Sequence, residues 1–279
     1  MPATRTATKT TTATKPATRA PAARMTLAET MRELEKAGSA QTRKTYARHG
    51  ATEPMFGVSF AILKTLRKRI GVDHELACAL WDTGNLDARY LAAKIVDPAR
   101  LSSADLDRWV RETSAQPMCG GYVAMLAAEG PHAAAKATEW LTAKDALARA
   151  AGWVLLGQLA QRDETLPDSW FKDRLAEIER TIHTAPNAER DSMNAAVIAI
   201  GCRNAAMRKA ATAAAKRIGE VDIDHGDTSC KTPEAASYID KAWTHSLEKG
   251  FAIWTPRLLS AAKRPLAARF LGECMKCDD

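Results

Sequence analysis

Apolar residues recur along this chain at the spacing of α-helices, and short breaks separate the helical stretches. From Ser59 onward, apolar side chains fall on one side of a helix wound at about 100° per residue, and basic side chains fall away from it. The apolar positions are Ile62, Leu63, Leu66 and Ile70. The basic positions are Lys64, Arg67 and Lys68. One face of this helix is predicted to join a core, and the other to meet an anion.

Two further stretches are apolar over most of their circumference. Residues 86–96 have few polar positions, and Asp87 and Lys94 lie seven residues apart on one stripe. Residues 193–200 are nearly all apolar. A helix of this kind must be covered on several sides, so both stretches are predicted to lie in the inner layer of a stack of helices.

The breaks between helices carry recognisable start and stop signals. Thr26 is predicted to cap the first helix, and Ser102 with Asp105 to cap a later one. The remaining breaks are Asp97-Pro98, Gly120-Gly121, Leu166-Pro167, Ala185-Pro186-Asn187 and Thr232-Pro233-Glu234, the last in the order N-cap, proline, acid. These signals predict about a dozen helices or slightly more in antiparallel pairs that recur every ~35 to 45 residues, the spacing of HEAT-like arrays.

Composition agrees with an all-helical protein and defines its ends. Of the 279 residues, 46% are hydrophobic, enough for a substantial core, while glycine and proline are sparse. Residues 1–24 are rich in Thr, Ala, Pro and basic residues and are predicted to be disordered. We therefore expect one α-helical repeat domain over residues 25–272 and a flexible tail over residues 273–279.

The positive charge is concentrated at the N-terminus. The chain carries +7, with 40 Lys and Arg against 33 Asp and Glu, and residues 1–24 contribute five of these charges and no acid. The tail fits a basic arm that holds phosphates, a solvated leader without a role, or a transit peptide. Because only +2 remains for the rest, a nucleic-acid surface there requires that charge be segregated onto one side.

Cysteine usage and hydropathy indicate an intracellular protein. The six cysteines are scattered through helical segments without a secretory signal, which is typical of reduced thiols in the cytoplasm. The longest largely apolar run, residues 150–160, is too short to cross a membrane. No phosphate-binding glycine-rich loop is present, and we expect no cofactor.

Two motifs resemble the DNA alkylation repair family of the AlkD type, which are HEAT-like repeat proteins that excise alkylated purines. Phe56-Gly57-Val58 followed by the basic helix matches an aromatic-Gly-Val turn of that family. Asp87 to Ala93 matches its acidic-x-Arg-aromatic-Leu-Ala-Ala helix. The resemblance covers roughly Met25 to Gly219. It implies a HEAT-like helical repeat solenoid and binding to DNA.

The resemblance carries over only some of the family's functional residues. In the family, an aspartate preceded by tryptophan stabilises the positive sugar that develops during base release, but Ala115 to Tyr122 offers glycine and proline there. A second family tryptophan is absent near Ile198 or Ala199. Arg149 matches the arginine that grips the DNA backbone. The resemblance therefore implies phosphate binding, and it leaves N-glycosylase activity open with no catalytic residue identified.

Three other features contain residue types that can bind metals or react, but each also has a structural explanation. The loop 220–231 gathers acids, His225 and Cys230, yet its spacing matches neither a calcium loop nor a zinc pair, so we expect no metal. Its aspartates would supply a carboxylate only if the loop folds over the inner face; these are Asp222, Asp224 and Asp227. Cys274 and Cys277 form a lone CxxC near the C-terminus, which is weak evidence for zinc or redox chemistry. Cys119 lies beside the Gly120-Gly121 break, where a helix terminus would make its thiol reactive, but a lone cysteine is usually a packing residue.

The sequence therefore predicts a monomeric DNA-binding protein that contacts the backbone with weak sequence preference through a concave basic face. The predicted DNA-binding residues are Lys64, Arg67, Lys68, Arg149, Lys209 and Lys216. The last two lie seven residues apart on one side of a helix over 203–218. The alternative is a non-enzymatic repeat scaffold that binds a protein partner, because the same fold serves both functions.

Overall fold

The computed structural model describes residues 24–113 and 117–248, with side chains described from residue 120 onward in the second range. This part of the chain forms thirteen α-helices and one 3-10 helix, Pro98–Arg100, and contains no strand, so the all-α prediction is confirmed. The α-helices are α1 (Leu27–Ala37), α2 (Ala40–Arg48), α3 (Phe60–Ile70), α4 (His74–Asp82), α5 (Leu86–Ile95), α6 (Ser103–Glu112), α7 (Pro117–Glu129), α8 (Ala133–Leu141), α9 (Ala146–Arg162), α10 (Asp168–Thr181), α11 (Asn187–Gly201), α12 (Ala205–Ile218) and α13 (Ala235–Glu248). The predicted tail residues 1–23 and 273–279 lie outside the described residues.

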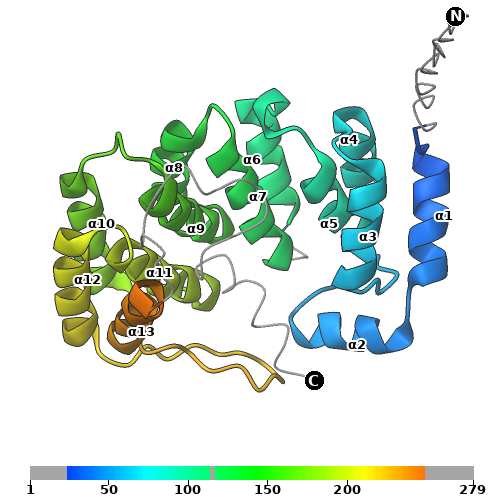
Figure 1. Ribbon diagram of the computed structural model, residues 1–279. Coiled ribbons are helices and arrows are strands. Elements are labelled where there is room, and N and C mark those ends of the chain that lie inside the picture. The colour runs from blue at the N-terminus through cyan, green and yellow to red at the C-terminus, as the bar shows by residue number, and fades with distance from the viewer. Residues whose placement is uncertain (1–23, 114–116, 249–279) are drawn as a thin grey trace, which may run out of the picture.

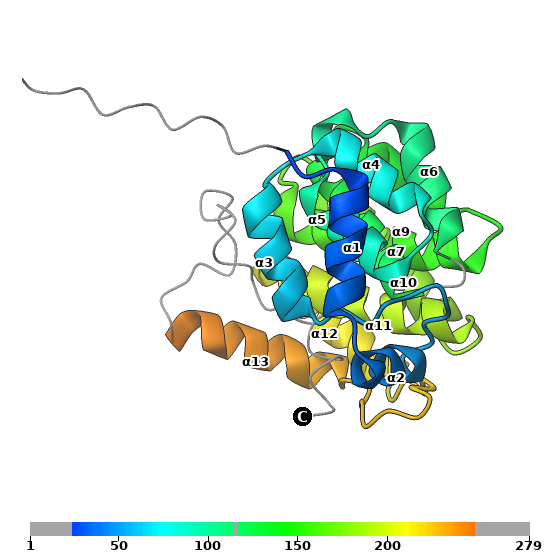
Figure 2. The same cartoon turned by 90° about the vertical axis from the view of Figure 1, so that its right-hand side faces the viewer.

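The helices form two layers along an arc. In the inner layer, α3, α5, α7, α9, α11 and α13 pack against one another in that order. In the outer layer, α4, α6, α8, α10 and α12 cover them. Figure 1 shows the arc running from α1 to α12, and Figure 2 shows α3 and α13 on one side of the molecule with α4 and α6 on the other. This arrangement is an array of stacked helix pairs.

Helix α9 lies at the centre of the array because both of its sides are apolar. Leu155 and Leu159 join the core that extends back to α1, whereas Trp153 and Leu156 join the core that extends forward to α13. The inner-layer prediction for residues 193–200 is also confirmed, since Met193 and Ile200 are buried in the second core. No helix in the described ranges is long and apolar enough to span a bilayer.

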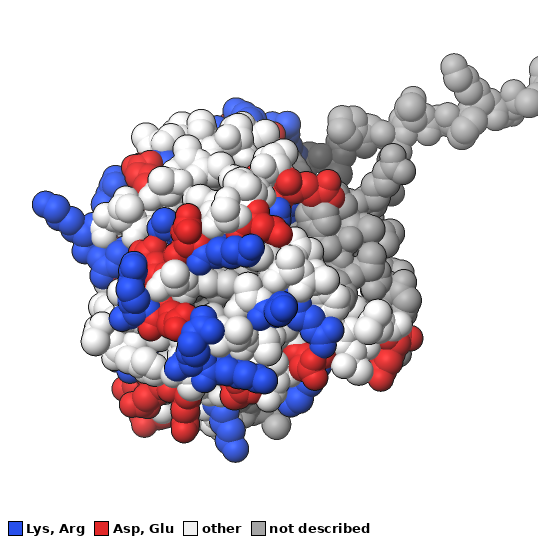
Figure 3. All heavy atoms as spheres, turned by 90° about the vertical axis from the view of Figure 1, so that its left-hand side faces the viewer, with Lys and Arg blue, Asp and Glu red and all other residues white. Residues whose placement is uncertain are grey.

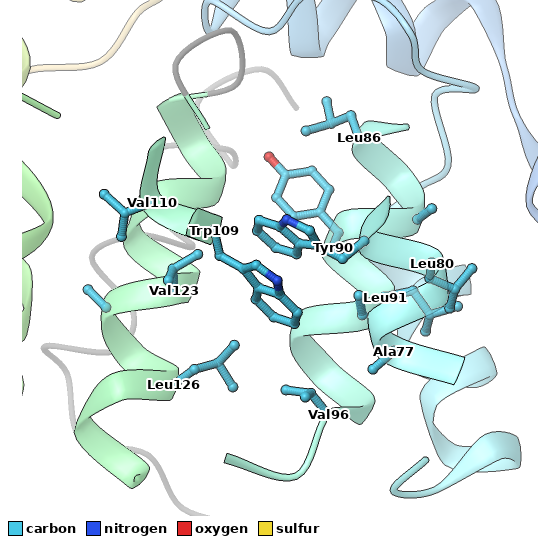
Figure 4. Close-up of a cluster of buried hydrophobic side chains, with 14 of the residues drawn as sticks. Ala77, Leu80, Leu86, Tyr90, Leu91, Val96, Trp109, Val110, Val123 and Leu126 are labelled. Carbon is cyan, nitrogen blue, oxygen red and sulfur yellow. The ribbon is translucent and has the colours of Figure 1, made fainter. Parts of the chain in front are cut away.

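Aromatic side chains fill the space between α5 and α7. Figure 4 shows Trp109 and Tyr90 lying between these helices with Val123 and Leu126. The Trp109 ring stacks on Trp81 at 4.0 Å between centroids and 3° between planes. Such a contact contributes about 0.5–1.5 kcal/mol beyond the area that it buries.

Most predicted helix starts are confirmed, two of them by the hydrogen bonds of their caps. Thr26 with Glu29 and Ser102 with Asp105 both form complete capping boxes. The prolines at the predicted breaks stand directly before α10 and α11. The local rules work here because a cap satisfies amides within three residues of itself.

Three local predictions are wrong. Gly120-Gly121 does not break a helix, because α7 begins at Pro117 and runs through both glycines. Helix α13 is capped by the carboxylate of Glu234, which accepts hydrogen bonds from the amides of Ala236 and Ser237, and not by Thr232. Ile62, assigned to the core side of α3, is 38% exposed.

The turn before α3 is held by a buried carboxylate. Asp87, at the start of α5, is fully buried and accepts three backbone hydrogen bonds, from Phe56 at 2.6 Å, Gly57 at 3.0 Å and Val58 at 2.7 Å. Burial raises the pKa of the Asp87 carboxyl, and the three N–H donors oppose that shift. The family motif is therefore a structural joint between two inner helices.

The same turn also contacts α2. Gly57 has a φ of +80°, and a Cβ there would lie 2.5 Å from the carbonyl oxygen of Ser39, so only glycine fits. Ser39 donates its N–H to the Gly57 carbonyl at 2.9 Å, and the Tyr46 hydroxyl donates to the Val58 carbonyl at 2.6 Å. Two helices, α2 and α5, thus fix where α3 begins.

We expect Asp87→Asn to destabilise the protein by about 3 kcal/mol, because asparagine offers one acceptor oxygen and directs an NH₂ group toward a buried donor. Urea unfolding followed by circular dichroism measures the change. Asp173→Asn on α10 is the matched control, since this exposed aspartate should alter stability by less than about 0.5 kcal/mol. Equal unfolding midpoints for the two variants would show that Asp87 does not hold the turn.

Candidate nucleic-acid interface

Helix α3 presents three cations that are not used inside the protein. Lys64, Arg67 and Lys68 are exposed, while Leu63 and Leu66 of the same helix are buried. None of the three cations makes a hydrogen bond or ion pair within the described part of the chain. The neighbouring Arg69 differs, because it bonds to Glu33 of α1. The basic helix of the sequence thus exists as predicted, on a helix of the inner layer.

A fourth cation, which the sequence analysis did not select, lies beside α3. The Nζ atom of Lys94 on α5 is 5.7 Å from the centroid of the Phe60 ring on α3 and 4.5 Å from that of the Tyr122 ring on α7. All three side chains are partly exposed. The sequence indicates that Asp87 and Lys94 lie on one side of a helix, but it does not show which aromatic rings contact that side.

Arg149 at the start of α9 is largely engaged within the protein. Its guanidinium bonds to the carboxylate of Glu189 on α11, with Nε at 3.0 Å from both oxygens and Nη2 at 2.9 Å from one of them. Its Nη1 donates to the carbonyls of Ala143 and Lys144 at 2.9 and 2.8 Å. Because Arg has five N–H donors, little of it remains for a phosphate. The structure therefore places Arg149 as a joint between α9, the loop that precedes it and α11.

Lys209 and Lys216 are exposed on α12, which belongs to the outer layer. They are flanked by ion pairs on both sides of the helix, Arg208 with Asp240 and Arg217 with Glu179. Figure 3 shows that basic and acidic side chains are interspersed over this end of the molecule. The structure thus brings Lys64, Arg67 and Lys68 together and separates Lys209 and Lys216 from them.

Comparison with known proteins decides the family. The family model described as DNA alkylation repair enzyme matches residues 30–239. The chain belongs to the DNA alkylation repair enzyme family. Among relatives, the uncharacterized proteins Lmo0209 of Listeria monocytogenes and Lin0241 of Listeria innocua are each 29% identical to it over 217 residues, which cover 75% of this chain and 94% of theirs.

A solved structure supports the same assignment for this DNA alkylation repair family member. It is 30% identical, has a TM-score of 0.73, and is matched over 84% of this chain and 99% of its own. It is described as a member of a new family of proteins related to the HEAT-like repeat DNA glycosylases, with affinity for branched DNA structures. The predicted HEAT-like repeat fold is therefore confirmed.

The start of α7 is where the resemblance to the DNA alkylation repair family predicts an acid in active members. Gly120 and Gly121, which lie in this stretch, carry no side chain that could act on a substrate. The side chains of residues 114–119, including Cys119, lie outside the described residues. The described part of α7 thus offers no carboxylate before Glu129 at its far end.

The loop between α12 and α13 is attached to the inner layer. Asn187 of α11 bonds to both backbone groups of Asp224, at 2.7 and 2.8 Å, and Arg190 donates to the Asp222 carbonyl at 2.6 Å. The carboxylates of Asp222, Asp224 and Asp227 belong to exposed residues. No three His, Cys, Asp or Glu residues of the described ranges are grouped closely enough to hold a metal ion. Cys274 and Cys277 lie outside those ranges.

The tip of this loop reaches the other end of the array. A Cβ at Gly226 would lie 3.5 Å from the carbonyl oxygen of Arg48, the last residue of α2. Figure 1 shows the loop running from α12 along the lower edge of the arc toward α2. Helix repeats ordinarily contact only their neighbours, so the approach of the loop between α12 and α13 to the end of α2 is a contact between distant parts of the array.

We expect Arg149→Met to destabilise the protein by about 3 to 5 kcal/mol, because the buried carboxylate of Glu189 loses its partner. The double variant Arg149→Met/Glu189→Gln should recover part of the loss, since it leaves no unpaired charge. Urea unfolding measures both effects, and Arg217→Met in the exposed pair with Glu179 should cost less than about 1 kcal/mol. A single-variant loss no larger than that of Arg217→Met would contradict the structural role of Arg149.

Proposed function

We propose that this protein binds DNA, including branched DNA, through backbone phosphates, and that α3 provides a principal contact. The observation that carries the proposal is the group of three exposed cations without partners among the described residues, Lys64, Arg67 and Lys68, on an inner-layer helix. The affinity of the solved relative for branched DNA supports it. Phosphate contacts predict weak sequence preference and strong dependence on salt.

Branched DNA suits such a surface for an electrostatic reason. At a junction, phosphates from several arms lie closer together than in a straight duplex, and the potential that attracts cations is correspondingly stronger. Cations on the inner layer of a curved array can contact more than one arm at a time. On the outer layer, several arginines are instead paired with acids, as in Arg217 with Glu179 and Arg208 with Asp240.

We propose further that binding proceeds without N-glycosylase activity on alkylated purines. Release of a cationic purine leaves positive charge on the sugar, and a carboxylate close to that sugar stabilises it. The glycines Gly120 and Gly121 replace such a group in the described part of α7. In this proposal the protein keeps the DNA binding of the family and lacks its N-glycosylase activity.

The charge-reversal pair Lys64→Glu/Lys68→Glu should weaken binding to a four-way junction at least about tenfold at low salt and lower the slope of log affinity against log salt by about 2. The pair Lys209→Glu/Lys216→Glu is a matched control. It changes net charge equally, and it too has one lysine in the last turn of its helix. Fluorescence anisotropy across a salt series provides both quantities.

Equal losses for the two pairs would mean that net charge, and not the position of α3, controls binding. If the wild-type protein binds neither duplex nor junction DNA, the proposal fails and the protein-binding scaffold replaces it. The variant that begins at residue 25 separates the fold from the basic tail, because binding by the fold must persist without residues 1–24.

Incubation with DNA that carries N7-methylguanine should release no more free base than the spontaneous reaction. Chromatography of the released bases measures this, with a family member of known glycosylase activity as the positive control. Release well above the spontaneous rate would require a carboxylate that the described part of α7 does not supply, and the non-enzymatic part of the proposal would be withdrawn while the binding part would stand.

A further inference from the structure

Lys94 of α5 lies against aromatic side chains of the two inner helices beside it, α3 and α7. Its ammonium lies 4.5 Å from the centroid of the Tyr122 ring and 5.7 Å from that of the Phe60 ring. Tyr90 supports both rings from within the core, with centroid distances of 5.1 Å to Phe60 and 5.4 Å to Tyr122. The aromatic rings are therefore fixed in position, and the ammonium is held between α3 and α7.

The ammonium lies toward the N-terminal end of α3. Helices α3 and α5 run parallel, because Val58, just before α3, bonds to Asp87 at the start of α5, and the Asp73 amide, just after α3, bonds to the Ile95 carbonyl at the end of α5. Helical side chains lean toward the helix N-terminus, so the long side chain of Lys94 extends along α5 toward Phe60, the first residue of α3. Helix N-termini carry partial positive charge, which adds to the attraction for an anion.

The chemistry around the Lys94 ammonium selects a phosphate over a base. The ring faces of Phe60 and Tyr122 already contact the ammonium, which leaves them less available for stacking on a nucleobase. Apolar walls lower the local dielectric constant and strengthen the attraction between an ammonium and an anion. The same charge repels a cationic alkylated base or a sugar that develops positive charge.

We propose that Lys94 is a phosphate-binding residue that continues the basic face of α3 onto α5, and that Phe60 and Tyr122 position it. Phe60, which meets Lys94, follows one side of α3 with Lys64 and Arg67 at helical spacing, so Lys94 borders the same side of α3 as these cations. This inference rests on the proposed DNA binding. In this inference Lys94 adds a phosphate contact from a second helix, α5, and gives the basic surface of α3 and α5 a preference for anions at its centre.

The test compares binding of a four-way junction by full-length Lys94→Gln, Lys94→Met, Lys94→Arg and wild-type proteins across a salt series. Removal of the charge should weaken binding about threefold to tenfold and lower the salt slope by about 1, because one phosphate contact is lost. Lys94→Arg should keep the wild-type slope. Lys172→Gln on outer helix α10 removes one exposed charge as the matched control and should leave the slope unchanged. Thermal unfolding of each variant shows whether the fold is retained, and Lys94→Met preserves the apolar contact with the rings.

The outcomes separate this inference from the function on which it rests. If wild-type protein binds and the α3 double variant is weakened while Lys94→Gln and Lys94→Met bind normally, Lys94 makes no phosphate contact and this inference alone is wrong. The same conclusion follows if both neutral variants lose affinity without a change in salt slope, because Lys94 would then be only a joint between helices. If the wild-type protein binds no DNA, the proposed function fails and this inference fails with it.

Discussion

The bonds from three consecutive backbone amides to the buried carboxylate of Asp87 are the interaction on which the rest of this surface depends. A carboxylate without these donors would be costly to bury, and the donors without the carboxylate would leave three polar groups unsatisfied. Because each side requires the other, the turn before α3 has one arrangement relative to α5. That arrangement sets Phe60 beside Tyr90 and exposes the cations that follow along α3.

The charges of the two layers are arranged differently. On the outer helices, several arginines pair with acids of the neighbouring helix or of their own turn, as Arg217 does with Glu179 and Arg174 with Glu177. Exposed pairs of this kind contribute about 0–1 kcal/mol each to stability, but they cancel the field that a nucleic acid would detect. On α3, Lys64, Arg67 and Lys68 have no such partners in the described part of the chain, whereas Arg69 pairs with Glu33. A chain with little excess charge outside its N-terminal tail can thus present a basic surface.

Helices, caps and layers could be predicted from the sequence because their causes are local. Thr26 and Ser102 accept hydrogen bonds from amides three residues away. The nearly all-apolar composition of residues 193–200 predicts their burial. The candidate site was harder to predict from the sequence, because the contacts that define it join residues that are far apart in the chain. The sequence predicts that Arg149 binds phosphate, but in the structure its guanidinium bonds to Glu189, forty positions later. Lys209 and Lys216 have the same spacing whether α12 is inner or outer, and only the packing shows that it is outer. Lys94 could not be identified as a candidate site residue from the sequence, because its contacts with Phe60 and Tyr122 arise only when the helices pack.

Lysine footprinting measures the central claim most directly, namely that the inner layer and not the outer one meets DNA. The protein would be acetylated briefly with and without a four-way junction, and the modified lysines would be identified by mass spectrometry. The account predicts that DNA protects Lys64, Lys68 and Lys94, while Lys209 and Lys216 react at unchanged rates. Protection of the two α12 lysines with continued reaction at α3 would contradict it.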